Sequence, residues 1–315
     1  MMIKTKAIRK IFITTLTMFI ILTVFSIPSI DVDNSLRVNL ELEEVSSIST
    51  NNIYLMNSSG YLVKSKILLD EEDNQEKIEK ILNNLIKNEN SKFSNGLVAT
   101  IPENVDVKEV ICGSNLATIN FSNEFLNVGI SFEKQMISSI VYSILDIDGI
   151  EGVSILVEGK SLECYPNTKE KLPTVLDKSI GINKQYELTS RENISSVVVY
   201  YLENINEELY YVPVTKYIND ERDKIKIIVE ELTTSYIYEE NLMSFLNSKT
   251  KLLDYKEEND VLFLNFNEYL FDNNDKVLEE VIYAIGYSVF DNYDVSMVMF
   301  EVNGQEVDYI TRNEM

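Results

Sequence analysis

The sequence repeats itself, because one order of predicted strands and helices occurs twice, about 145 residues apart. Each copy opens with a β-rich run, at residues 53–55 and 199–201, and continues with a helical pattern, a pair of strands, a second helical pattern and a last strand. This order predicts an α+β fold with two tandem β-α-β-β-α-β modules, each one sheet with two helices on one face.

The helices of the two copies can be aligned. Asp73 and Asp220 precede the first helix of each copy and are the predicted N-caps. In the second helix, an apolar series from Met136 to Ile144 matches one from Val277 to Ile285, which aligns Tyr142 with Tyr283. The predicted first module covers residues 51–165 and the second covers 196–311. Residues 166–195, with two prolines, are the predicted linker.

Residues 11–30 contain no charged side chain, and they lie between a basic and an acidic flank: Lys4, Lys6, Arg9 and Lys10 precede them, and Asp31 and Asp33 follow. Such a segment can cross a bilayer as a helix, and its basic flank predicts a cytoplasmic N-terminus. We expect residues 1–30 to form a single-pass membrane anchor that leaves the rest extracytoplasmic. A cleaved signal segment, which would give a secreted protein, is the alternative. Residues 31–50 are polar and acidic and are predicted to be a spacer.

The rest of the chain is strongly acidic. The net charge is −23, and without the four basic residues that precede residue 11 the remainder has 24 basic and 51 acidic residues, a net charge of −27. Nucleic-acid binders gain affinity by neutralising phosphates with Lys and Arg. The sequence therefore predicts no nucleic-acid partner.

Several short motifs resemble a known family. The strand end and turn at residues 118–126 precede a helix that contains residues 140–145, and a strand that ends in Glu158-Gly159-Lys160 follows. These motifs resemble the GerMN domain of sporulation and spore germination proteins, and the second copy keeps them more loosely at residues 265–270 and 302–305. The resemblance implies a role in sporulation or germination at the cell envelope, in a module used for protein assembly. It also implies a layout similar to the ring-building modules of envelope secretion machines. Family members are often lipoproteins, but no cysteine ends the apolar segment here.

The sequence offers few residues for chemistry. It has no histidine, which removes the commonest general base and nucleophile systems, and no glycine-rich phosphate loop. Asp146 and Asp148 resemble a fragment of a calcium loop, but the distal glutamate is missing. We predict no catalytic residue, no cofactor and no metal site. Whether Cys112 and Cys164 form a disulfide stays open.

Two further features bear on function. Acidic pairs such as Glu230-Glu231 and Glu257-Glu258 fall on predicted helix faces and turns, where solvated surface charge is the ordinary explanation. Four tyrosines near the start of the second copy are either half-buried sheet residues or part of an interface: Tyr200, Tyr201, Tyr210 and Tyr211. Open sheet edges can accept a partner strand. We therefore expect a non-enzymatic scaffold that contacts envelope or sporulation-complex proteins, or itself. A wall-associated binding or lytic protein that uses carboxylates is the alternative.

Overall fold

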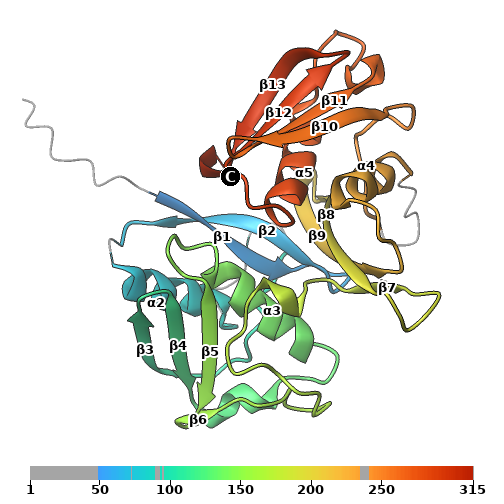
Figure 1. Ribbon diagram of the computed structural model, residues 1–315. Helices are drawn as coiled ribbons and strands as arrows, with labels where there is room; N and C mark the ends of the chain where they lie inside the picture. The colour runs from blue at the N-terminus through green and yellow to red at the C-terminus, as the bar shows by residue number, and fades with distance from the viewer. Residues whose placement is uncertain (1–48, 72, 89–92, 94–95, 235–240, 315) are drawn as a thin grey trace, which may run out of the picture. The chain divides into compact units, whose positions relative to one another are not determined.

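The computed structural model describes residues 49–71, 73–88, 93, 96–234 and 241–314. Contacts join residues 48–315 into one compact unit. The first module contains β1 (Ser49–Met56), β2 (Leu62–Leu69), α2 (Asn74–Leu85), β3 (Val107–Gly113), β4 (Leu116–Phe121), α3 (Glu133–Ile144), β5 (Gly152–Val157) and β6 (Lys160–Ser161) (Figure 1). The second contains β8 (Ser195–Ile205), β9 (Glu208–Ile218), α4 (Lys224–Thr234), β10 (Leu252–Glu258), β11 (Val261–Phe266), α5 (Glu279–Phe290), β12 (Met297–Val302) and β13 (Gln305–Thr311). The short β7 (Gln185–Glu187) lies between the modules in sequence.

Each module contains a four-stranded sheet of the same topology. The order is β3-β4-β5-β6 in the first module and β10-β11-β12-β13 in the second. The middle strands are parallel in both, with Leu116 opposite Gly152 and Val261 opposite Met297, and the outer pairs are antiparallel. The α3 and α5 helices make the crossovers between the parallel strands. The tandem α+β repeat is thereby confirmed.

The prediction of one sheet per module is wrong, because the first two strands of each module form a separate hairpin. The outer edge of β1 faces α3: the Tyr54 N–H donates to Ser143 Oγ at 2.9 Å, and Ser139 Oγ donates to the Tyr54 carbonyl at 2.5 Å. In the second module the Tyr200 N–H donates to Ser288 Oγ of α5 at 2.9 Å. Helix hydroxyls satisfy backbone groups that a neighbouring strand would otherwise bond. Each hairpin is thus held away from the four-stranded sheet by a helix.

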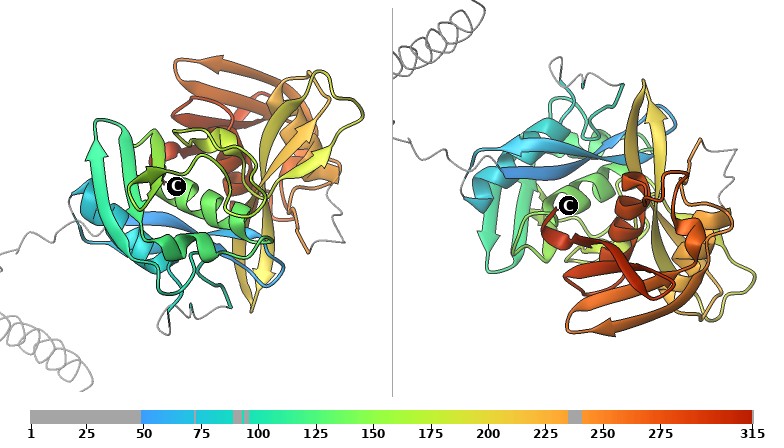
Figure 2. Two further views of the ribbon diagram at one scale, coloured as in Figure 1. Left: turned by 90° about the horizontal axis from the view of Figure 1, so that it is seen from below. Right: turned by 90° about the horizontal axis from the view of Figure 1, so that it is seen from above.

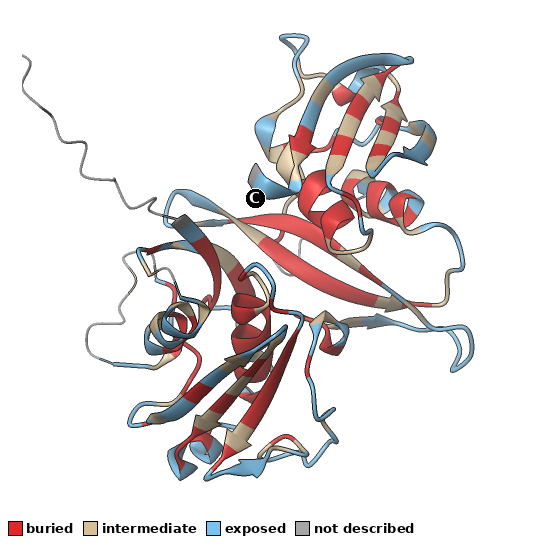
Figure 3. Cartoon of the chain, turned by 60° about the vertical axis from the view of Figure 1, so that its left-hand side comes forward, coloured by how far each residue is buried: buried red, intermediate tan, exposed pale blue. Residues whose placement is uncertain are grey.

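The two hairpins meet in a five-stranded sheet that both modules share. Its order is β1-β2-β9-β7, with β8 also paired to β9. The modules join where β2 pairs antiparallel with β9, at Lys64 opposite Tyr211, while β7 runs parallel to β9 (Figure 2). Figure 3 shows that buried residues dominate the middle of the β8–β9 hairpin. The strand edges of one module are therefore partly used to bind the other.

The helix boundaries test the cap predictions. The Asp73 carboxylate accepts from the Gln75 and Glu76 N–H groups, which confirms it as the N-cap of α2. Asp220 is not a cap, because α4 begins at Lys224, and the carboxylate that accepts from the Ile225 N–H is that of Asp223. The Asp220 carboxylate instead pairs with the guanidinium of Arg222.

The alignment of Tyr142 with Tyr283 is also wrong, by one helical turn. Ser143 and Ser288 bond equivalent strand residues, so the residue before each, Tyr142 or Tyr287, is the equivalent one. Residues three or four positions apart share a helix face, so both alignments place apolar residues on the same side.

The segment between the modules is packed rather than free. The Leu176 backbone exchanges two hydrogen bonds with Val153 at 2.8 Å, and Ile182 is fully buried. The buried Glu133 carboxylate accepts from the N–H groups of Asn167 and Thr168 at 2.6 and 3.1 Å. Residues 166–195 therefore connect the modules and also fill space against them.

The N-terminal expectations concern residues that the structure does not describe. The membrane segment at residues 11–30 and residues 31–48 of the spacer lie outside the described ranges, and the last two spacer residues, Ser49 and Thr50, open β1. None of the helices within the described ranges is long and apolar enough to span a bilayer.

Candidate functional site

Equivalent residues of the two modules contact each other where the hairpins meet. The Tyr54 hydroxyl lies 3.4 Å from the Tyr200 hydroxyl, and these residues are 146 positions apart. Asn57 Nδ2 donates to Glu203 Oε2 at 2.5 Å, again across 146 positions. All four residues are buried. Contact between equivalent positions is the mark of a two-fold interface, so the two modules meet as a homodimer would.

The linker reinforces this junction through Asn183. The Asn183 amide donates to the carbonyls of Leu62 in β2 and Pro213 in β9, at 2.7 and 2.8 Å. Asn183 Oδ1 accepts from the Leu62 N–H at 2.9 Å. One side chain thus bonds a strand from each module.

A cavity of about 560 Å³ opens at the junction. Its wall includes residues of both modules and of the linker: Asn52, Tyr54, Lys64, Lys77, Asp146, Asp148, Lys178, Tyr200, Tyr287, Asp291 and Arg312. Small-molecule sites in proteins typically occupy about 300–1,000 Å³. This cavity, the junction cavity below, is our candidate functional site.

An ion pair between the buried Asp291 and the half-buried Lys178 closes one part of the junction cavity. Asp291, the C-cap residue that follows α5, accepts from Lys178 Nζ at 2.5 Å and from the Tyr200 hydroxyl at 2.7 Å. Burial by itself would raise the pKa of Asp291, but the Lys178 ammonium and the Tyr200 hydroxyl hold it below its usual value. Asp291 therefore remains a carboxylate that joins the linker to the second module.

Lys64 of β2 lies beside this pair without joining it. Its ammonium lies 3.4 Å from the centroid of the Tyr287 ring, a cation–π contact. Burial lowers the pKa of Lys64 to about 7, although Asp146 and Asp291 act in the opposite direction. Lys178 and Lys66 add to the lowering.

The pKa of Lys64 predicts how the stability of the protein depends on pH. An unfolded lysine titrates near 10.4, so between pH 7 and pH 10 the unfolded chain holds a proton that folded Lys64 has released. The contribution of Lys64 to the free energy of unfolding should therefore rise with pH in this window, by about 1–3 kcal/mol in total for a half-buried side chain. Burial raises the pKa values of Tyr54 and Tyr200, and these tyrosines act in the opposite direction near pH 10, so the contribution is measured as the difference between the parent chain and Lys64→Met in denaturant unfolding at pH 7, 8.5 and 10. Lys64→Met should be more stable than the parent chain at pH 7, and this difference should shrink as pH rises to 10; a difference that does not change with pH would refute the assignment.

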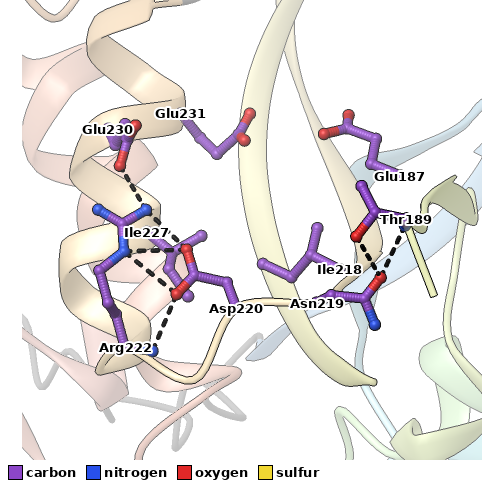
Figure 4. A pocket seen from close by; sticks show the side chains of 9 residues that line it. All are labelled: Glu187, Thr189, Ile218, Asn219, Asp220, Arg222, Ile227, Glu230 and Glu231. Carbon is purple, nitrogen blue, oxygen red and sulfur yellow. Dashed lines mark hydrogen bonds and ion pairs between the residues drawn. The ribbon is translucent and has the colours of Figure 1, made fainter. Parts of the chain in front are cut away.

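A second cavity, of about 190 Å³, lies beside β7, β9 and α4 (Figure 4). Arg222 pairs there with Asp220 and Glu230, and Asn219 Oδ1 accepts from Thr189 (Figure 4). The buried Lys216 binds both Glu187 and Glu231, at 2.7 and 2.6 Å. The acidic pair Glu230-Glu231 therefore neutralises basic side chains.

The structure also locates the cysteines, the aspartates and the tyrosines that the sequence suggests as functional candidates. Cys112 and Cys164 are free thiols. Asp146 lines the junction cavity and accepts from the N–H and side-chain amide of Asn52, at 3.1 and 2.7 Å. No group of three possible metal ligands occurs within the described part of the chain. Tyr200 and Tyr201 are buried, and Tyr210 and Tyr211 are half-buried, so the four are sheet residues, and Tyr200 also contacts the other module.

Sequence reasoning missed the basic residues of the junction cavity. Lys64, Lys178 and Arg312 lie far apart in the chain, and no local motif marks them. The repeat itself offered one signal, since Tyr54 and Tyr200 stand at matching positions of the first strands.

Comparison with known proteins decides the family. A family model named Germane, described as "Sporulation and spore germination", matches residues 52–163 and 198–308. The chain belongs to the Germane family. The spore germination protein GerM of Bacillus subtilis is 26% identical over 275 residues, which cover 84% of this chain and 74% of GerM.

Solved structures agree with this membership. The tandem GerMN domains of the sporulation protein GerM from Bacillus subtilis superpose with a TM-score of 0.76 at 25% identity, over 84% of this chain and 97% of that chain. The two Germane matches include the first-strand tyrosines, Tyr54 and Tyr200, whereas Lys178 and Asn183 lie between the two matched ranges. The junction is thus built from two Germane modules and from the segment that separates their matched ranges.

Proposed function

We propose that this Germane protein acts in sporulation or spore germination as a non-enzymatic scaffold that binds other envelope proteins, or further copies of itself, through its two modules. The observation that carries the proposal is the likeness to GerM, which extends over both modules and 84% of the chain. The joined hairpins support it, because a shared sheet fixes the outer surfaces of the two modules in one arrangement.

The outer sheets offer contact surfaces for such partners. β10 and β13 are the edge strands of the second four-stranded sheet, and Leu253 and Tyr309 on them are each 53% exposed. Edge strands present backbone groups that a partner strand can bond. In the first module Ile130 and Phe132 are similarly exposed, before α3.

The proposal includes a location. The uncharged stretch at residues 11–30, with its basic flank, supports a single-pass anchor and an extracytoplasmic body. A scaffold needs no general base, and this chain has no histidine, the residue that most often acts as one.

Complementation tests the proposal. The full chain, produced in Bacillus subtilis lacking GerM, should restore the yield of germination-competent spores. A variant in which four residues of the apolar segment are replaced by aspartate should fail, because it loses the anchor. Full activity of that variant would contradict the location. Release of sugars from purified peptidoglycan by the full chain would contradict the non-enzymatic role and favour a lytic protein.

A further inference from the structure

Three basic side chains of the junction cavity form no ion pair within the described part of the chain. Lys64, Lys77 and Arg312 all line it. None of them takes part in an ion pair with any residue that the structure describes. Most of the other basic side chains without an ion pair do not line this cavity, so what sets these three apart is that they line the same cavity as Lys178.

The three cations come from separate elements. Lys64 lies on β2 against the ring of Tyr287, and Lys77 lies on α2. The Arg312 guanidinium donates to the backbone carbonyls of Phe290, Tyr293 and Val295, at 2.9–3.2 Å. These carbonyls lie at and after the C-terminal end of α5, where a cation is favoured, and the guanidinium carbon lies 5.0 Å from the centroid of the Phe290 ring.

Two of the three acidic groups in the junction cavity are already occupied. Asp291 binds Lys178 and Tyr200, and Asp146 accepts two hydrogen bonds from Asn52. With the exposed Asp148, the described lining of the cavity has three acidic and four basic side chains, a net charge of +1 at pH 6, where Lys64 is protonated. A positive cavity in a protein with a net charge of −23 concentrates anions locally.

We propose that the junction cavity binds a small polar molecule that carries an oxyanion, either a phosphate or a carboxylate, and that Lys64 pairs with this group. The cavity volume, about 560 Å³, suits a ligand of this kind. The wall also includes Tyr54 and Tyr200, whose rings and hydroxyl oxygens can contact the uncharged part.

The position of Lys64 gives a physical reason for such a site. A half-buried ammonium without a carboxylate partner costs stability, and proteins commonly retain such costs at functional positions. An oxyanion next to Lys64 would remove that cost and raise the pKa of the lysine. Binding should therefore be tighter at pH 6, where Lys64 is protonated, than at pH 8.5.

Isothermal titration calorimetry of the full chain, in a non-ionic detergent and low salt at pH 6, tests the proposal. Inorganic phosphate and citrate are the two probes. Saturable binding of one molecule per chain is expected for at least one probe, and the probe that binds assigns the oxyanion. Lys64→Met should weaken that binding at least about tenfold and Lys77→Gln several-fold.

The controls separate a built site from general attraction of anions. Lys108 forms an ion pair with Glu158 and does not line the junction cavity, so Lys108→Gln should leave binding unchanged. Lys64→Met is expected to be at least as stable as the parent chain, so its loss of binding cannot be ascribed to unfolding. The proposal fails if neither probe gives saturable heat, or if Lys108→Gln weakens binding as much as Lys64→Met.

Discussion

Replacing Asp291 with asparagine should lower the free energy of unfolding at pH 7 by about 2–4 kcal/mol. The carboxylate is 7% exposed and binds both Lys178 and Tyr200, so its loss leaves the Lys178 ammonium without an ion pair. Breaking a fully buried pair costs about 3–5 kcal/mol, and we expect less here because the Lys178 side chain is 40% exposed and can hydrate. Denaturant unfolding of the full chain measures the difference.

The pH dependence of Asp291 provides an independent test. Its folded pKa lies below its unfolded value, so its stabilisation is present above the unfolded pKa, near 3.9, and is lost as pH falls through the folded pKa. The difference between the parent chain and Asp291→Asn should therefore shrink in acid. Asp148→Asn, at an exposed position of the same cavity, should change stability by less than about 0.5 kcal/mol. Equal effects of the two substitutions would contradict the role of the ion pair.

Replacing either core phenylalanine at the end of a parallel strand with alanine should lower the free energy of unfolding by about 3–5 kcal/mol. Phe121 ends β4 and stacks on Phe125 with ring centroids 4.4 Å apart, and Phe266 is its equivalent at the end of β11. Both are fully buried, so Phe121→Ala and Phe266→Ala each leave a cavity in the core of one module.

The matched control for these variants is Phe132→Ala. Phe132 is 43% exposed, so this substitution should lower the free energy of unfolding by well under 1 kcal/mol. Thermal unfolding of all three variants gives the comparison. Because the modules share a sheet, each core variant should lower the stability of both modules. Loss of stability in the substituted module alone would show that the modules fold independently.

The sequence was sufficient to predict the repeat and most of its elements. Period and turn signals located the hairpin of β3 and β4 and its counterpart in β10 and β11, because those patterns are local. The separation of the first hairpin from the four-stranded sheet could not be predicted, since it depends on Ser139 and Ser143 of α3 reaching the edge of β1. Serines on an apolar helix face look like small core residues until the strand is placed beside them.

The junction cavity could not be predicted from the sequence either, because it also depends on contacts between distant parts of the chain. Lys64 and Arg312 are 248 positions apart, and they line the same cavity in a fold where β2 pairs with β9. Pairing between the modules at Lys64 and Tyr211 rests on a single position of the register, which no hydrophobic period encodes. The tyrosine interpretation likewise needed the structure, because Tyr200 is both a buried sheet residue and a contact between the modules.

The central claim is that the two Germane modules form one cooperative body, and the absence of tryptophan from the chain makes it testable. A single tryptophan can be placed in the first module as Phe132→Trp and in the second as Tyr309→Trp, both at exposed positions. Guanidinium unfolding of the full chain in a non-ionic detergent, followed by tryptophan fluorescence, then reports on each module separately. We predict one transition with the same midpoint for both probes. Two transitions at clearly different midpoints would contradict the account.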